Sequence, residues 1–380
     1  MSNGLLEEIH MVKNHSLKTR RIYSDAVKKY TEFCSMTLEE LIEEAEFEED
    51  QGIKWKKRKL KRRLLSFRQF LLERYSLNAV LSVFRPIIAI YKYYEIELFS
   101  LPPINKKNVR TAEPILFKDL PDKEVIRKAI AIATPVMAAV IYFMASSGCA
   151  RQETLNLTIG DYIDALNEYT TKTDIYEVLN ELKDVENVVP TFKILRQKTD
   201  KYYTTYCSPE AVESINSYLL SRKEPLRNES PLFKIEINYL AFKFTQINNE
   251  LGLGKVGSFN RFRSHMLRKF HASALYNDGM SLDNVNDLQG KAKNKTDQSY
   301  FMINPEDLKY EYIKHLPAVT INHDVEKLSI KSPEFLQMEN ENKELKSEVG
   351  DMRKELDEMK ELKKEFYGIL QKAKERSNVQ

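Results

Sequence analysis

The segment Met144-Ala-Ser-Ser-Gly-Cys-Ala-Arg-Gln-Glu-Thr-Leu-Asn-Leu157 joins an apolar helical run to a new helical pattern that starts at Arg151. Before it, residues 122–144 are apolar at helical spacing, and Pro135 is expected to break this run in two. After it, residues 188–195 and 202–206 are rich in β-forming side chains, so a hairpin is expected. The mixture predicts an α+β fold that is mainly helical with a small β-sheet.

Further helices are expected on both sides of this segment. Proline 209 is typical of a helix start, and this helix should run to about Leu220. The remaining apolar spacing predicts helices over 238–250, 264–277 and 281–288, and over 18–33, 56–73 and 78–94 in the first hundred residues. Another helix should begin after Thr37, with Glu40 completing a capping box. The prolines and polar residues of 101–110 predict an interdomain linker.

The last part of the chain has a different pattern. Apolar residues alternate by four and three positions from Met338 through Leu345, Met352 and Leu356 to Leu370, with Asn342 and Lys363 on the same seam. This heptad spacing predicts a coiled coil over 333–375 that joins subunits. A single long solvated helix is the alternative.

Composition excludes several classes of protein. The chain has 380 residues, of which 42% are hydrophobic and 30% charged, and its net charge is only +3. The charge is unevenly placed, because residues 39–50 are acidic and residues 54–63 are basic. Three separated cysteines argue against a disulfide framework and a zinc cluster, and the histidines lack ligand spacing. Without an apolar run of about 18 residues, a soluble, cytoplasmic protein is expected.

Five residues have side chains suited to the cleavage of a phosphodiester. His265 and Arg268 are three apart in a helical pattern, so they share one face. Serine 258 or 264 is expected to cap this helix. With Arg151, Lys198 and Tyr300, they supply what metal-free cleavage of a phosphodiester requires. These requirements are a nucleophile, forked cations for two phosphate oxygens, and an acid for the leaving oxygen.

The ordered set resembles the tyrosine recombinase (phage-type integrase) family, in particular its archaeal members. By this resemblance, Tyr300 is the nucleophile that holds the 3′ phosphate, Arg151 and Arg268 clamp the phosphate, and Lys198 protonates the leaving oxygen. His265 and Lys291 assist. Residues 1–99 resemble the core-binding domain, 100–112 the linker and 113–320 the catalytic domain. The family acts on double-stranded DNA as a tetramer and needs no metal or nucleotide cofactor.

This chain departs from the family pattern at two places. The common Gly-x-Arg-x-x-Glu is here Gly148-x-x-Arg151-x-Glu153, and the common Gly-His or Gly-Trp pair is here Gly290-Lys291. Tyr310 and Tyr312 are alternative nucleophiles, but they follow Pro305 and are expected on a separate helix. Their distance from Gly290 does not fit the family.

Basic residues in the run 54–63 and around His265 and Lys291 are predicted to contact DNA phosphates. Such contacts position a duplex without specifying its sequence. These residues are Lys54, Lys56, Lys57, Arg58, Lys59, Lys61, Arg62, Arg63, Arg261, Arg263, Lys269 and Lys293. A glycine pattern at 252–257 lacks the strand that a dinucleotide site needs, so a loop is expected there. The predicted function is site-specific DNA recombination. The alternatives are a type IB topoisomerase and a catalytically silent DNA-binding or partitioning protein with the same fold.

Overall fold

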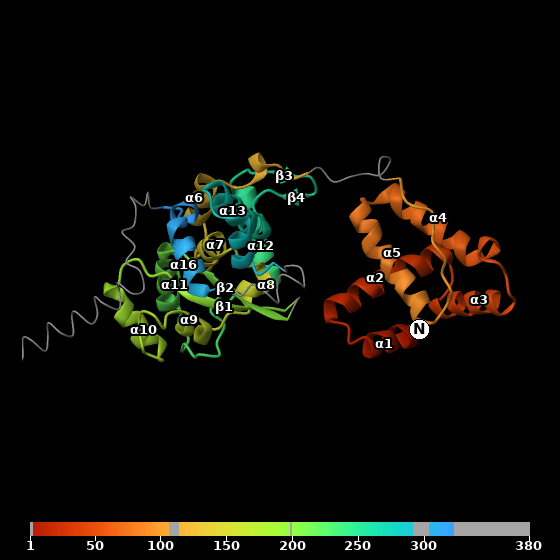
Figure 1. Ribbon diagram of the computed structural model, residues 1–380, viewed down its shortest axis with the longest axis horizontal. Helices are drawn as coiled ribbons and strands as arrows, with labels where there is room; N and C mark the ends of the chain where they lie inside the picture. The colour runs from red at the N-terminus through yellow and green to blue at the C-terminus, as the bar shows by residue number, and fades with distance from the viewer. Residues whose placement is uncertain (1–2, 106–113, 198–199, 292–303, 323–380) are drawn as a thin grey trace, which may run out of the picture. The chain divides into compact units, whose positions relative to one another are not determined.

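The computed structural model describes residues 3–105, 114–197, 200–291 and 304–322, and the chain divides into two compact units (Figure 1). Unit 1 is Met1–Ile115 and unit 2 is Leu116–Gln380. Each unit has its own apolar core. The predicted coiled coil over 333–375 lies outside the described residues. Most of the predicted linker does too, since only its residues 100–105 are described.

Unit 1 is helical. Tyr30 and Phe67 pack in its core, and the hydroxyls of Tyr30 and Tyr91 lie 3.1 Å apart, so each polar end is satisfied by the other. The helices are α1 (Asn3–Val12), α2 (Leu17–Cys34), α3 (Leu38–Asp50), α4 (Lys59–Arg74) and α5 (Leu77–Tyr93). The helices predicted over 18–33 and 78–94 are thereby confirmed as α2 and α5.

The start of α3 confirms the predicted capping box. The Glu40 amide donates to the Thr37 hydroxyl at 3.2 Å, and the Thr37 amide donates to the Glu40 carboxylate at 2.8 Å. Because both bonds satisfy amides that a helix start leaves without partners, the box sets where α3 begins.

The start of α4 differs from its prediction. The helix expected from residue 56 begins at Lys59, because Trp55–Lys57 forms a separate 3₁₀ turn, η1, and Arg58 is extended. Glu48 of α3 caps α4, since its carboxylate accepts the Lys59 amide at 2.8 Å. Glu48 is buried, although it belongs to the acidic run of residues 39–50.

Unit 2 is built around α7 (Pro135–Ser147), which is buried along most of its length and packs against α11 (Pro209–Ser221) and α13 (Ser264–Asn277) (Figure 1). The predicted break at Pro135 is confirmed, because α6 (Lys123–Ala131) ends before it. The helices predicted to start at Pro209 and to span 264–277 are confirmed as α11 and α13. The apolar α7 therefore provides the platform for the elements around it.

The predicted hairpin is formed by β1 (Thr191–Arg196) and β2 (Lys201–Tyr206), which pair antiparallel with Arg196 opposite Lys201. The residues at 252–257 form turns and part of a small second hairpin, as expected of a loop. Its strands are β3 (Lys255–Val256) and β4 (Phe259–Asn260). The fold is thus mainly helical with small antiparallel sheets, which confirms the predicted class.

Further helices complete unit 2. The predicted helices over 238–250 and 281–288 are observed as α12 and α14. Near the end of the described chain, α16 packs on β2 and α14. These helices are α8 (Arg151–Leu155), α9 (Ile159–Ala165), α10 (Ile175–Glu181), α12 (Ile237–Glu250), α14 (Leu282–Leu288), α16 (Pro305–Lys314) and α17 (Leu316–Val319), with 3₁₀ turns η3 (Phe117–Asp119) and η4 (Leu182–Asp184).

The capping prediction for α13 is wrong. The residue before its first turn is Arg263, which makes no side-chain capping bond, and Ser264 is the first residue inside the helix.

Candidate active site

Arg268 is buried on α13 and bonded to three other segments of unit 2. One terminal nitrogen, Nη1, donates to the Gly148 carbonyl at 2.5 Å and lies 3.5 Å from the Glu153 carboxylate. The other, Nη2, donates to the Gln289 carbonyl. Because carbonyl groups carry no net charge, these bonds orient the guanidinium while leaving most of its charge to act on a ligand.

Glu153 connects the surrounding elements. Its carboxylate accepts the Ala150 amide at 2.7 Å and the Tyr203 hydroxyl at 2.9 Å, in addition to its contact with Arg268. Burial of this carboxylate is tolerable because each of these donors compensates its lost hydration. The bond to Ala150 also caps the start of α8, and Arg151 is the first residue of that helix.

Gly148 permits the close approach of α7 and α13. It ends α7 with a φ of 66°, which favours glycine, and a Cβ there would lie 2.5 Å from Nδ1 of His271. His271 is fully buried, and burial together with the charges of Arg268 and Lys291 lowers its pKa to about 3. The ring is therefore neutral at neutral pH and serves as packing beneath the site.

Lys291 follows the turn that ends α14. Gly290 is left-handed, with a φ of 56°, and the Lys291 amide donates to the Asn286 carbonyl at 2.9 Å. This arrangement is a Schellman-type helix end, which sets the backbone conformation of the turn but not its position relative to β1 and α13. Burial lowers the pKa of Lys291, and Arg268 and then Arg196 lower it further. Lys291 and the two arginines thus form one coupled group of cations.

His265 lies on the first turn of α13 and remains accessible to solvent. Partial burial lowers its pKa, and Lys269, Arg263 and Arg268 add to the effect. A lowered pKa keeps the imidazole neutral at neutral pH, so one ring nitrogen can accept a proton. The predicted common face of His265 and Arg268 is consistent with α13, although only Arg268 is buried in it.

The structure brings together only part of the predicted set. Arg268, Lys291 and His265 are electrostatically coupled, whereas Arg151 is exposed. Among the described residues, no hydrogen bond or ion pair joins Arg151 to the other three. Lys198, Lys293 and Tyr300 lie outside the described residues.

The two alternative tyrosines differ in access. The Tyr312 hydroxyl is buried and donates to the Ser146 carbonyl at 2.9 Å, and burial raises the pKa of this phenol. Tyr312 is therefore unsuited to attack a phosphate. Tyr310 is on the same helix, α16, and is exposed. Their placement on a helix that starts at Pro305 agrees with the prediction.

Sequence reasoning missed four residues that build this region: Arg196, Tyr203, Gln289 and His271. Arg196 had a usable signal. Along β1, Phe192 and Ile194 are buried, and the alternation of a strand places Arg196 on the same face. An arginine in register with buried apolar residues indicates a specific internal partner. No comparable sequence signal identifies Gln289.

The basic run of unit 1 is only partly available to a ligand. Arg58 is buried, with Nε donating to the Ile53 carbonyl at 2.9 Å and Nη1 lying 3.2 Å from Glu49. These internal partners hold the Arg58 guanidinium, and the contact of Arg58 with phosphate stays a prediction. Lys59 and Arg63 pair with Glu44 of α3. The remaining residues are exposed or half-buried: Lys54, Lys56, Lys57, Lys61 and Arg62.

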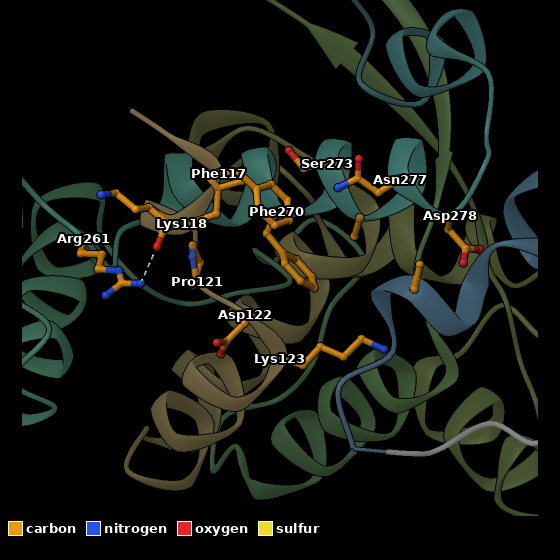
Figure 2. Close-up of a pocket in the computed structure, with 13 residues that line it drawn as sticks. Phe117, Lys118, Pro121, Asp122, Lys123, Arg261, Phe270, Ser273, Asn277 and Asp278 are labelled. Carbon is orange, nitrogen blue, oxygen red and sulfur yellow. Dashed lines mark hydrogen bonds between the residues drawn. The ribbon is translucent and has the colours of Figure 1, made fainter. Parts of the chain in front are cut away.

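The basic residues of unit 2 that are predicted to contact phosphate have different partners in the structure. Arg261 donates to the Lys118 carbonyl at 2.8 Å (Figure 2). Arg263 stacks over the ring of Phe259, 4.5 Å from its centroid. Lys269 is half-buried on α13 and acts on the pKa of His265. Arg263 and Lys269 are therefore near the catalytic candidates, whereas Arg261 belongs to another surface.

That surface is a pocket of about 470 Å³ between η3 and the second half of α13 (Figure 2). Phe117 and Phe270 contribute aromatic rings, and Asp122, Arg261 and Asp278 contribute charges. Its lining contains none of the predicted catalytic residues. The pocket is therefore distinct from the cation group around Arg268.

Three further observations concern the described part of the chain. The described residues contain no cluster of histidine, cysteine, aspartate and glutamate side chains that could bind a metal ion. None of the described helices has the length and apolar character needed to cross a membrane. The three cysteines are free thiols, and burial raises the pKa of Cys149 to about 11, so this thiol is unreactive.

Comparison with known proteins identifies the class. Residues 122–307 match the phage integrase family. This part of the chain is therefore a tyrosine recombinase domain, the domain of enzymes that cleave and rejoin DNA at specific sites. The predicted family is thus confirmed, and its archaeal character stays a prediction. No curated protein is significantly similar to this chain.

Several solved structures are similar to the chain at low identity. XerH site-specific recombinase bound to difH substrate is 20% identical, with a TM-score of 0.48, over 82% of this chain and 83% of that one. XerA recombinase is 18% identical, with a TM-score of 0.34, over 83% and 99%. A lambda integrase dimer bound to a COC′ core site is 11% identical, with a TM-score of 0.40, over 80% and 98%.

Proposed function

We propose that this protein recombines duplex DNA at specific sites through a 3′-phosphotyrosine formed by Tyr300. The observation that carries the proposal is the state of Arg268, which is buried, oriented by two backbone carbonyls and coupled to Lys291 and His265. A tetrahedral phosphate presents two non-bridging oxygens that gain charge as a nucleophile attacks. Oriented guanidinium donors in a site with little water stabilise that charge.

In the proposed reaction the Tyr300 phenol oxygen attacks the scissile phosphorus, and the bond from phosphorus to the 5′ oxygen breaks. The phenol proton passes to neutral His265, and Lys198 gives a proton to the leaving 5′ oxygen. Arg151 and Arg268 clamp the non-bridging oxygens, and Lys291 donates to the same phosphate. The 5′ hydroxyl of a second strand then attacks the phosphotyrosine, so the phenol is restored and no external energy is consumed.

The proposed assembly is a tetramer that exchanges strands between two DNA sites. Residues 1–99 would act as the core-binding domain and 113–320 as the catalytic domain. Exposed Lys54, Lys56, Lys57 and Arg62 would contact backbone phosphates. The coiled coil predicted over 333–375 would join subunits. Deletion of 333–380 is expected to lower the mass of the assembly in light scattering, and an unchanged mass would refute that role.

A covalent trapping experiment tests the reaction. The full chain is incubated with suicide DNA substrates of many sequences, and adducts are identified by denaturing electrophoresis and mass spectrometry. Wild-type protein should form a sequence-dependent adduct that Tyr300→Phe abolishes. Tyr310→Phe is the matched control, because Tyr310 is exposed on α16, and it should react like wild type.

The other outcomes separate the alternatives. Absence of an adduct with wild type would overturn the proposal and favour a silent DNA-binding protein. An adduct formed equally on every sequence would favour a topoisomerase. Loss of the adduct in Tyr310→Phe, but not in Tyr300→Phe, would assign the nucleophile to α16.

A further inference from the structure

Arg196, the last residue of β1, reaches two segments that are far from it in the sequence. Its Nη1 donates to the Gly290 carbonyl and lies 3.4 Å from the Gln289 carbonyl. Its Nε lies 3.7 Å from the Glu153 carboxylate. The side chain is 23% exposed, so these contacts are sheltered but not isolated from water.

Arg196 and Arg268 share two acceptors. The Gln289 carbonyl receives both guanidiniums, and the Glu153 carboxylate lies against Arg268 through one oxygen and Arg196 through the other. Two like charges would repel each other at this range, and the carboxylate between them offsets that repulsion. The Gly290 carbonyl differs from these shared acceptors, since Arg196 is bonded to it and Arg268 is not.

We propose that Arg196 is a positioning residue for strand cleavage, which holds the Gln289–Lys291 turn in place and so fixes Lys291 beside Arg268. The inference rests on the proposed function for its catalytic meaning, since Lys291 acts there on the scissile phosphate. Arg196 itself need not touch DNA. Its planar fork suits this role because it can reach two successive carbonyls and a carboxylate at once.

The two arginines should respond differently to loss of Arg196. Arg268 would keep its bonds to Gly148, Gln289 and Glu153. The turn would keep the backbone bond from Lys291 to Asn286 but lose the donor at Gly290. The effect should therefore pass through Lys291, whose ammonium group has to meet a phosphate within about an ångström to contribute fully.

A double-mutant cycle tests this route. Single-turnover cleavage of suicide DNA is measured at saturating DNA for wild type, Arg196→Gln, Lys291→Gln and the double variant. Arg196→Gln should slow cleavage by about 10- to 100-fold, with DNA affinity nearly unchanged. In the Lys291→Gln background the same change should alter the rate by no more than about twofold. Lys193→Gln is the matched control, because it removes one charge from an exposed position of the same strand.

Several results would overturn the inference. The first is a wild-type cleavage rate in Arg196→Gln. The second is a rate loss in the control Lys193→Gln as large as the loss in Arg196→Gln. The third is full additivity of the Arg196→Gln and Lys291→Gln effects on the cleavage rate. Arg196→Lys keeps the charge but not the fork, so it should stay slow. Full activity of this variant would show that charge alone is required, which also contradicts positioning by hydrogen bonds.

A second readout does not depend on cleavage. Arg268, Arg196 and His271 are electrostatically coupled to Lys291, and Glu153 lies between the two arginines. Because Arg196 lowers the pKa of Lys291, the pH dependence of Lys291 acylation, followed by mass spectrometry, should shift to higher pH in Arg196→Gln, and an unchanged profile would contradict the proximity of the two cations. If wild type forms no adduct, the proposed function fails while this measurement still decides the inference.

Discussion

The two units hold their basic residues in opposite ways. In unit 1, Lys59 and Arg63 face the carboxylate of Glu44, so acidic α3 cancels part of the basic run. In unit 2, Arg268 donates to two backbone carbonyls and lies 3.5 Å from the carboxylate of Glu153, which Arg196 and the Tyr203 hydroxyl also share, so its charge is only partly offset. A carboxylate partner orients a cation and neutralises it, whereas a carbonyl orients it and leaves the charge. The difference teaches that burial and pairing, not the number of cations, decide where an anion is recognised.

The largest expected effect tests this contrast directly. Arg268→Gln should reduce suicide-DNA cleavage by about 10²- to 10³-fold, because an oriented donor to the developing charge is lost. Arg63→Gln removes a charge that is already paired with Glu44 and should change the cleavage rate by less than about threefold. Single-turnover kinetics on the full chain measures both. Equal losses in the two variants would break the comparison.

Acid should destabilise unit 2 through His271. The pKa of this ring is about 3 in the folded chain, compared with 6.5 for an ordinary histidine. Between these values the unfolded chain binds the extra proton, so the free energy of unfolding falls as pH drops below 6.5, by about 1.4 kcal/mol per pH unit. His271→Gln should remove this part of the slope.

Hydrogen exchange of the α7 amides at pH 7, 6 and 5 measures the slope for unit 2 specifically. His265→Gln is the control on the same helix and should keep most of the acid dependence, since His265 is accessible to solvent. An identical slope in wild type and His271→Gln would show that other groups govern acid stability.

Arg58 should matter for the stability of unit 1 and not for DNA contact. Arg58→Ala removes the bonds to Ile53 and Glu49 and should lower the free energy of unfolding by about 2 kcal/mol. Arg62→Ala, at an exposed position, should change it by less than about 0.5 kcal/mol. The single tryptophan, Trp55, lies in unit 1, so its fluorescence in a urea titration reports on this unit. A stable Arg58→Ala variant with weakened DNA binding would support the predicted phosphate contact.

The smallest expected effect concerns the exposed cations of unit 1. Replacing Lys56, Lys57 and Arg62 by glutamine should weaken DNA binding about tenfold at moderate salt. It should also reduce the slope of log affinity against log salt by about 3, as expected for three lost phosphate contacts. Fluorescence anisotropy across a salt series measures both quantities. A salt slope equal to that of wild type would exclude these residues from the interface.

Sequence reasoning succeeded where the signal is local. The break at Pro135, the Thr37–Glu40 box and the β1–β2 hairpin each depend on residues only a few positions apart. It missed the internal partners of Arg58 and of Arg196. Two of these partners, the carbonyls of Glu97 and Gly290, are distant along the chain. No local pattern states which carbonyl a guanidinium will meet.

By itself, the sequence determined the longer helices and the hairpin, because caps, prolines and periodicity act over one or two turns of chain. The family followed from the order of the catalytic candidates along the chain. It also placed His265 and Arg268 on one helix. Only the tertiary structure decided which cations are neutralised and which remain active. That outcome depends on Glu153 and Gln289 meeting Arg268 across separate elements, and such meetings follow from how α7, α13 and α14 pack.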